Sequence, residues 1–228
     1  MQITSPRPDH SPKPCDFCDE LAGGSGNAFA LTYGHVISSR HMIAGGSFCV
    51  LPSLGQIVEG HLLLVPQAHL ASMAELADGE MGALEVLCKQ IRSVLVDMYG
   101  QCVFFEHGVR HAGSGGCGID HAHLHAVPVA GNGILAVLMH NFAGSRIDHF
   151  ADIRRTIGPA FSYLFFEDSS GERYVFAAPS IPSQYLRKLV CESLGKSDWD
   201  WRKSGYEPEL VSTLQRLSSV FSTVVTVP

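Results

Sequence analysis

Three histidines alternate with apolar residues near the middle of this 228-residue chain, in the run 121–127. They are His121, His123 and His125. Because successive side chains of a β-strand point to opposite faces, this spacing predicts a strand that carries all three imidazoles on one face. A glycine-rich segment, 108–118, leads directly into the run. Imidazoles in phase behind such a segment indicate a functional site; the plainer alternatives are a solvent-facing polar strand edge and a histidine-rich metal patch.

Apolar patterns around the histidines predict a mixed fold. The predicted strands cover 48–51, 61–65, 102–106 and 121–129. Apolar residues recur at spacings of three and four over 84–98, which is typical of an amphipathic helix, and Gly100 closes it. The order strand, strand, helix, strand, strand predicts an α+β domain built on an antiparallel sheet.

The character of the sequence changes after residue 142, and we place a soft domain boundary near residue 148. Beyond it, strands at 162–166 and 173–177 are predicted to form a hairpin, followed by helices over 182–194 and 207–220. The chain therefore divides into three parts. These are a flexible N-terminal segment (1–14), a main domain (15–148) and a smaller α/β C-terminal extension packed on it (149–228).

Composition argues against several classes of protein. The formal charge is −6 and Lys and Arg are scattered, which disfavours a nucleic-acid binder but not a protein that binds small nucleotides. The polar N-terminal segment lacks the apolar core of a signal peptide, and no apolar run is long enough for a bilayer. We therefore expect a cytoplasmic protein without membrane contact.

Cysteine usage points to a metal or redox site. Seven cysteines without a secretory signal argue against a disulfide framework. For the C-x-x-C pair Cys15 and Cys18, spacing alone fits zinc, redox chemistry and chance about equally, although the polar segment ahead of Cys15 suits a thioredoxin-like site poorly. Four further cysteines in apolar or helical contexts are predicted to be inert core thiols. They are Cys49, Cys88, Cys102 and Cys191.

Two motifs in the same order resemble the histidine-triad (HIT) family. The run 121–127 fits that family's signature His-φ-His-φ-His-φ-φ, where φ is apolar. The segment 59–69 resembles its Gly-His-apolar strand, followed by Pro66-x-x-His69. The resemblance covers about residues 15–129, a little over half of the chain. It implies a HIT-like antiparallel sheet with flanking helices and makes residues 15–148 the HIT-like catalytic domain.

The resemblance implies a catalytic set of four histidines. They are His61, His121, His123 and His125. His123 would attack the α-phosphorus of a nucleotide to form a nucleotidyl-histidine intermediate. A neutral imidazole attacks through Nε2 only when Nδ1 holds the proton, so we expect a backbone carbonyl to accept from Nδ1. His125 would donate to the phosphate oxygens, and His61, on the neighbouring strand, would add a further donor.

The same resemblance implies a zinc site. A zinc-containing branch of the family, and the related galactose-1-phosphate uridylyltransferases, carry a C-x-x-C motif that pairs with two histidines. By that resemblance the metal ligands are Cys15, Cys18, His69 and His121. A Cys₂His₂ set closes the coordination sphere, so the implied Zn²⁺ is structural and pins the N-terminal segment to the histidine strand.

Five residues would contact substrate, and all of them except Gly116 depart from the family pattern. They are Ser53, Glu106, Gly116, Cys117 and Gly118. Gly118 stands where a Ser or Thr assists the leaving group, Cys117 where Gln is common, and Ser53 where an Asp or Asn contacts ribose. Glu106 replaces an amide, and a carboxylate repels phosphates unless it is protonated or paired. Candidates for the missing proton or the compensating charge are His107, Arg110 and His111.

Together these features predict a hydrolase of nucleoside phosphoramidates or dinucleoside polyphosphates. One alternative is a nucleotidyltransferase or phosphorylase that uses the same intermediate, since the acceptor decides the reaction; another is a catalytically weak nucleotide-binding scaffold. A DNA-end-repair enzyme is disfavoured because no basic strand-binding surface is visible. Trp199 and Trp201 fit either a nucleobase platform or buried packing. A homodimer with a joined sheet, as in the small triad proteins, is compatible with the sequence.

Overall fold

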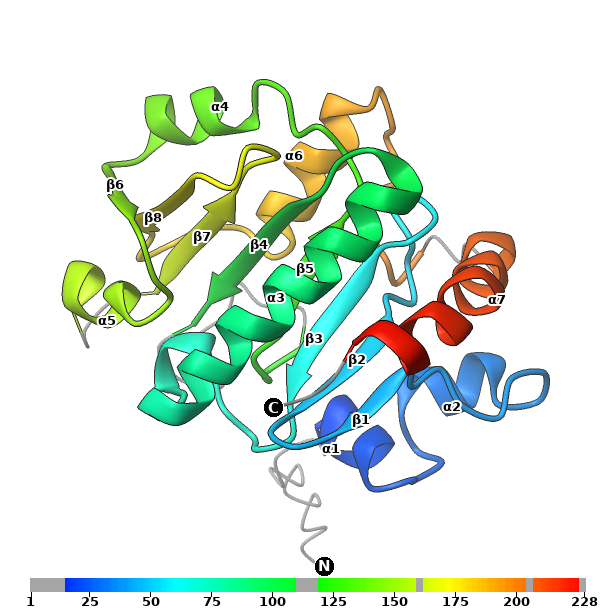
Figure 1. Cartoon of the computed structure of the whole chain (residues 1–228). Coiled ribbons are helices and arrows are strands. Elements are labelled where there is room, and N and C mark those ends of the chain that lie inside the picture. Colours follow the sequence, from blue (N-terminus) through cyan, green and yellow to red (C-terminus); the bar gives the residue numbers. More distant parts are fainter. Residues whose placement is uncertain (1–14, 110–118, 159–161, 204–206, 226–228) are drawn as a thin grey trace, which may run out of the picture.

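The computed structural model describes residues 15–109, 119–158, 162–203 and 207–225. In this part of the chain eight strands form one sheet in the order β1-β2-β3-β5-β4-β7-β8-β6, with antiparallel pairing throughout (Figure 1). The strands are β1 (Ile43–Gly45), β2 (Phe48–Pro52), β3 (Leu62–Pro66), β4 (Val103–Gly108), β5 (Leu124–Val127), β6 (Gly144–Ile147), β7 (Tyr163–Glu167) and β8 (Arg173–Ala177). The predicted α+β fold on an antiparallel sheet is confirmed.

Helices flank this sheet. They are α1 (Asp16–Leu21), α2 (Ala28–Tyr33), α3 (Asp78–Tyr99), α4 (Ile134–Asn141), α5 (Asp152–Ile157), α6 (Tyr185–Ser193) and α7 (Glu207–Val224), with a 3-10 turn at Met73–Glu75. The long helix α3 crosses one face of the sheet, and the C-terminal helix α7 lies beside β2 (Figure 1).

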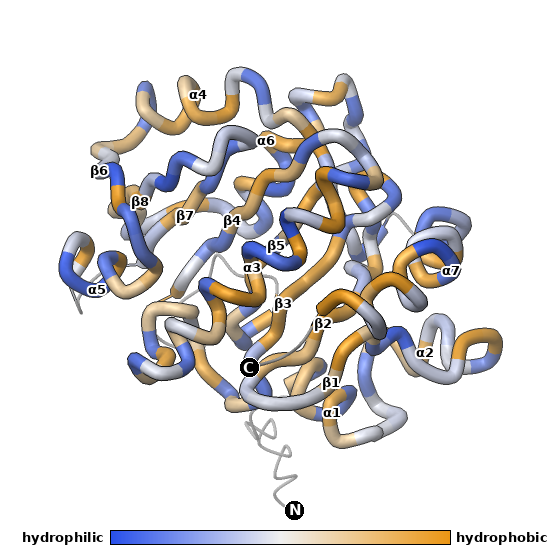
Figure 2. The backbone as a smooth tube through the Cα atoms, viewed as in Figure 1, coloured by the Kyte–Doolittle hydropathy of each residue, from blue (hydrophilic) through white to orange (hydrophobic). Residues whose placement is uncertain are grey.

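Apolar side chains cover both faces of the sheet. Leu64, Phe104 and Leu124 point toward α3 and share one core with Ile91 of that helix. The opposite face carries Phe105 and packs against α1, α4 and α6. Because the strands alternate between two buried faces, β2 and β3 are hydrophobic along their length, whereas α3 mixes hydrophobic and hydrophilic residues (Figure 2).

The strongest sequence patterns correspond to observed elements. Helix α3 buries residues at spacings of three and four and ends at Gly100, whose φ of 88° is the left-handed value that glycine adopts without strain. The histidine strand is shorter than predicted, since β5 begins at Leu124, but the alternation extends upstream because Ala122 packs in the α3 core. The elements not predicted from sequence are all short: α1, α2, α4, α5, β1 and β6.

The C-terminal extension continues the sheet. β7 pairs with β4, with Phe166 opposite Phe105, and β8 and β6 follow outward. Pairing with β7 therefore occupies the edge of β4 within the same chain. The two outer strands of the sheet are β1, which is three residues long, and β6. A joined-sheet homodimer would have to form through one of these.

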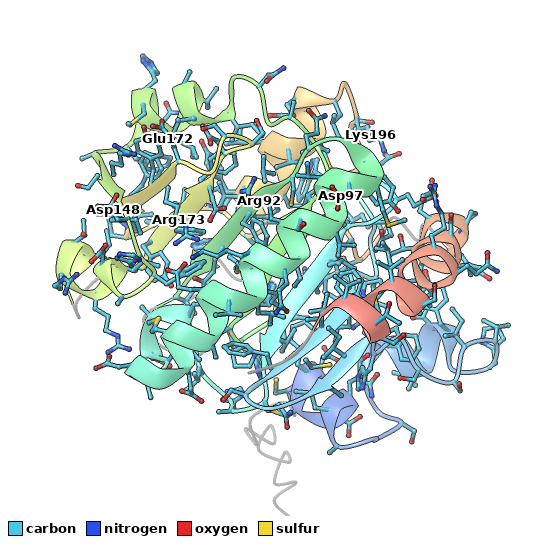
Figure 3. The ribbon with its side chains drawn as sticks, viewed as in Figure 1. Arg92, Asp97, Asp148, Glu172, Arg173 and Lys196 are labelled. Carbon is cyan, nitrogen blue, oxygen red and sulfur yellow. The ribbon has the colours of Figure 1, made fainter. Side chains whose placement is uncertain are left out.

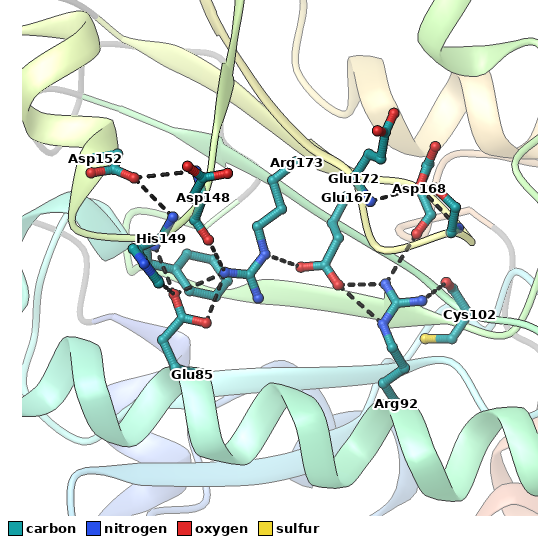
Figure 4. A network of polar contacts seen from close by, with 12 residues as sticks. Glu85, Arg92, Cys102, Asp148, His149, Asp152, Glu167, Asp168, Glu172 and Arg173 are labelled. Atoms are coloured by element: carbon teal, nitrogen blue, oxygen red, sulfur yellow. Dashed lines mark hydrogen bonds and ion pairs between the residues drawn. The ribbon is translucent and has the colours of Figure 1, made fainter.

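A buried network of charges ties α3 to the C-terminal strands (Figures 3 and 4). The Glu167 carboxylate, 3% exposed, accepts from Arg92 Nε of α3 at 3.0 Å and from Arg173 Nε of β8 at 2.6 Å. Arg173 Nη1 also donates to Glu85 of α3 at 2.7 Å. Removing one member of such a network typically destabilises a protein by about 3–5 kcal/mol, because its partners stay buried without their counter-charge. The network thus fixes β7 and β8 against the helix.

Among the described residues, no helix combines the length and the apolar character that crossing a membrane requires.

Candidate active site

A pocket lies on the sheet face opposite α3. Its empty space is about 650 Å³, open solvent at the mouth included. His123, His125 and His107 line it from the sheet, and residues of α6 and the following loop line another wall. The structure therefore gathers part of the predicted catalytic set at one hollow.

The backbone fixes the protonation of His123. Its Nδ1 lies 2.7 Å from the carbonyl oxygen of His121, and because a carbonyl only accepts, Nδ1 carries the proton. Burial lowers the pKa of His123 to about 4, although this hydrogen bond opposes the shift. The ring is therefore neutral at pH 7, with the lone pair on Nε2. This is the tautomer that a nucleophilic imidazole needs.

A chain of hydrogen bonds gives His125 the opposite tautomer. The Ile57 N–H donates to His61 Nδ1 at 3.2 Å, so the proton of His61 is on Nε2. That nitrogen lies 2.9 Å from His125 Nδ1, which must accept, so the proton of His125 is on Nε2. Burial lowers the pKa of both rings well below the usual value, and neighbouring positive groups lower it further. His125 thus offers the site an N–H donor, and Phe105 stacks on its ring with 4.4 Å between centroids.

His61 has a different place from the one predicted. Its side chain is fully buried, and both ring nitrogens bond within the protein, one to Ile57 and one to His125. The sequence motif correctly puts it beside the triad, but the prediction that it donates directly to phosphate is wrong. His61 Nε2–H donates to His125 Nδ1, so His61 sets the orientation and tautomer of His125.

Two cysteines and two histidines converge at the base of the histidine strand. Cys15 Sγ lies 3.4 Å from His121 Nδ1, and Cys18 Sγ lies 3.3 Å from His69 Nδ1. The four ligand atoms all fall within 4.8 Å of one another. Tetrahedral zinc sites with Zn–S of about 2.3 Å and Zn–N of about 2.0 Å hold their ligand atoms about 3.3–3.8 Å apart. The cluster can therefore hold a metal ion of that kind.

His121 connects this cluster to the pocket. Its Nε2 donates to the Pro66 carbonyl at 2.8 Å, which leaves Nδ1 with a lone pair that faces the cysteines. Its backbone carbonyl accepts the proton of His123. Phe17 of α1 packs edge-on against both rings, at 5.6 Å and 5.5 Å between centroids. Helix α1 thus supports the strand that carries the candidate nucleophile.

Glu106 does not reach the pocket, so its prediction as a substrate-binding residue is wrong. Adjacent residues of β4 point to opposite faces, and Glu106 shares the α3 side with Phe104. There its carboxyl accepts from Met73 N–H at 2.8 Å and from the Tyr163 hydroxyl at 2.6 Å. Burial raises its pKa to about 7, and these two hydrogen bonds oppose the rise.

The other residues named from the sequence fall into three groups: those that line the pocket, those outside the described residues, and the core cysteines. Ser53 lines the pocket. His107, one of the candidates for the missing proton or the compensating charge, lines it too. Gly116, Cys117 and Gly118 lie outside the described residues, as do Arg110 and His111. The four core thiols are buried as predicted, and burial raises their pKa.

The C-terminal extension supplies pocket residues that the sequence reading missed. Tyr185, Arg187 and Trp201 line the pocket, whereas Trp199 packs into the apolar cluster beneath α6. They lie sixty or more residues after the triad, and no motif marks Tyr185 or Arg187. Trp201 is one of the two tryptophans that the sequence analysis names, whereas Tyr185 and Arg187 were not predicted.

An antiparallel sheet with flanking helices, carrying a histidine triad at a pocket, defines a HIT-like α+β protein. More particularly, the chain belongs to the family described as "Protein similar to CwfJ C-terminal", which it matches over residues 4–139, more than half of its length. Comparison with curated proteins finds no match.

Several solved structures are similar to this chain. A member of the HIT family from Bacillus subtilis is 18% identical, covering 58% of this chain and 100% of that one, with a TM-score of 0.39. A zinc-bound histidine triad family protein from Mycobacterium smegmatis is 15% identical, covering 50% and 74%, with a TM-score of 0.39. A HIT family protein from Bacillus anthracis is 16% identical, covering 52% and 74%, with a TM-score of 0.39.

The raised pKa of Glu106 predicts a pH-dependent effect of the isosteric change Glu106→Gln. The unfolded chain loses this proton near pH 4.5 and the folded protein near pH 7, so the wild type loses stability as pH rises across that window. Glutamine has no proton to lose and keeps both hydrogen-bonding partners. Relative to wild type, the variant should gain on the order of 3 kcal/mol in unfolding free energy from pH 4.5 to 7.5, measured by urea unfolding. A difference that stays constant with pH would show that Glu106 ionises normally.

Proposed function

We propose that this protein is a hydrolase that acts at the α-phosphate of a nucleoside phosphoramidate or dinucleoside polyphosphate through a nucleotidyl-His123 intermediate. The observation that carries the proposal is the pair of opposed tautomers at the pocket. His123 presents a lone pair on Nε2, and His125, two residues on, presents an N–H donor. A nucleophile beside a donor for the phosphate oxygens is the minimum arrangement for attack at phosphorus.

In the first step, the Nε2 lone pair of His123 forms a bond to the α-phosphorus. The bond from phosphorus to the leaving group breaks, and the leaving group departs with that electron pair and acquires a proton. His125 Nε2–H donates to a non-bridging oxygen as negative charge gathers there. The imidazole of the intermediate carries a positive charge, which the His121 carbonyl stabilises through the existing Nδ1 hydrogen bond.

In the second step, water attacks the same phosphorus and loses a proton. The P–N bond breaks, its electron pair returns to Nε2, and His123 regains its neutral form. The products are a nucleoside monophosphate and the protonated leaving group. Because the histidines are buried and neutral, the site begins and ends each turnover in the same protonation state.

We further propose that the Cys₂His₂ cluster holds one Zn²⁺. Cys15, Cys18, His69 and His121 supply two thiolates and two imidazoles, a set that closes the coordination sphere. Such an ion would supply structural cross-linking rather than activate water. What supports this is the hydrogen bond of His121 Nε2 to Pro66, which leaves Nδ1 available as a ligand atom.

Metal analysis and a matched pair of cysteine variants test the zinc proposal. Purified wild type should contain about one zinc per chain, and Cys15→Ser should lose most of it and unfold at a lower temperature. Cys191→Ser removes a buried cysteine of α6 and should retain the metal. Protein purified without zinc, together with a Cys15→Ser variant as stable as wild type, would contradict the proposal.

Turnover of an adenosine phosphoramidate and a dinucleoside polyphosphate tests the reaction. His123→Ala should lower kcat at least about a thousandfold while still binding nucleoside monophosphate, because only the attacking atom is lost. His140→Ala, an exposed histidine of α4, is the control and should match wild type. Quenching wild type during turnover with denaturant at alkaline pH, where the phosphorus–nitrogen bond survives, should trap a nucleotidyl adduct on His123 that is visible by mass spectrometry.

The outcomes separate the competing functions. A wild type that binds nucleotide but turns over none of the substrates would identify a scaffold. Product bearing added phosphate rather than water would identify a transferase. A His123→Ala variant as active as wild type would overturn the mechanism.

A further inference from the structure

The C-terminal extension forms part of the pocket wall. Gln184, Tyr185, Leu186, Arg187 and Trp201 all line it. Helix α6 holds this wall against the sheet, since Leu186 and Val190 are buried in the same cluster as Phe105 of β4. The extension is thus built into the site beside the triad.

Arg187 brings a buried positive charge to the histidine end of this pocket. The residue is 3% exposed, and its Nε donates to the Trp199 carbonyl, which fixes the direction of the guanidinium. A Cβ placed on Gly55 would lie 2.8 Å from Arg187 Nη2, so this nitrogen lies against the turn that follows Ser53. The charge of Arg187 also adds to the burial that lowers the pKa of His61 and His125, in keeping with a guanidinium near those rings.

The pocket needs a cation at this end if it is to hold a phosphate. The hydrogen bonds of the triad leave His123 with a lone pair toward the pocket and His125 with a single N–H donor, so further donors are needed to hold phosphate oxygens. The other arginine that lines the pocket, Arg40, donates through Nε and Nη2 to the Glu20 carboxylate at 2.7 Å each. A guanidinium stays charged at any working pH, and its planar donors suit phosphate oxygens.

The loop that completes the wall is held in a costly conformation. Gln184 has φ 63° and ψ 22°, which makes it the one non-glycine with positive φ in the described chain. Its side chain donates to Asp200 at 3.0 Å and accepts from the Trp201 N–H at 3.3 Å. Left-handed backbone is unfavourable at a non-glycine residue and persists where surrounding contacts enforce it. This residue therefore anchors the Trp201 loop next to Arg187.

We propose that Arg187 binds the phosphate oxygens of the substrate, so that the C-terminal extension completes the phosphate site of the triad. The inference rests on the proposed function, because it assumes that a nucleotide occupies the pocket. It assigns the extension a direct part in substrate binding. It also adds planar, charged donors to the single N–H that His125 offers.

Comparing the affinity for nucleoside monophosphates with that for the matching nucleosides distinguishes recognition of the phosphate from recognition of the nucleoside. The probes are AMP, GMP, CMP and UMP, each compared with its nucleoside by calorimetry on the full chain. Arg187→Met should weaken monophosphate binding at least tenfold and leave nucleoside binding unchanged. Arg187→Lys keeps the positive charge but lacks the planar guanidinium donors. Its affinity for monophosphates should lie between those of Arg187→Met and wild type. Arg146→Met, an exposed arginine of β6, should behave as wild type.

The possible results test the role of Arg187 separately from the proposed function. Unchanged monophosphate binding by Arg187→Met, or equal losses for nucleotide and nucleoside, would overturn the role of Arg187 and leave the proposed function standing. A wild type that binds no monophosphate and turns over no substrate would instead defeat the proposed function. If the variants do not fold, a crystal structure of wild type with AMP decides directly. The phosphate should lie within hydrogen-bond distance of the guanidinium, and a phosphate bound elsewhere would overturn the inference.

Discussion

The hydrogen bond from His123 Nδ1–H to the His121 carbonyl is the interaction on which the site depends. At 2.7 Å it holds the proton on the nitrogen that faces the backbone and so leaves Nε2 as the base. His121 can hold this carbonyl in place because its ring is anchored by Pro66 on one side and faces the cysteines on the other. One residue therefore joins the cysteine-histidine cluster to the candidate nucleophile, which explains why both motifs occur in the same domain.

His123 and His125 lie on one strand face but carry opposite tautomers, because hydrogen bonds from different backbone groups fix which ring nitrogen is protonated. A carbonyl receives the proton of His123, whereas the Ile57 N–H donates to His61, and that ring in turn sets His125. Burial keeps all three rings neutral, so the tautomers do not depend on small changes in pH near 7. A lone pair and a donor are thereby fixed side by side without any charged residue between them.

Local patterns predicted the parts of the structure that local physics controls. The alternation at the triad and the helical spacing of α3 led to the sheet and its main helix. The four-residue cluster was predicted from the family resemblance instead, because the C-x-x-C spacing alone left zinc, redox chemistry and chance open. Glu106 was misplaced because a motif aligns a residue but not the face of the strand it occupies. Arg187 was missed because its role comes from α6 folding back onto the sheet, a long-range contact that no local spacing records.

The central claim concerns where protons sit on imidazole rings, and ¹⁵N NMR reads that directly. Long-range ¹H–¹⁵N spectra of protein labelled at histidine report whether each ring nitrogen carries a proton, and His123→Gln and His125→Gln variants assign the signals. At pH 7 the account predicts a neutral His123 protonated at Nδ1 and a neutral His125 protonated at Nε2. A His123 ring that is protonated at Nε2, or on both nitrogens, has no lone pair to offer phosphorus and would contradict the account.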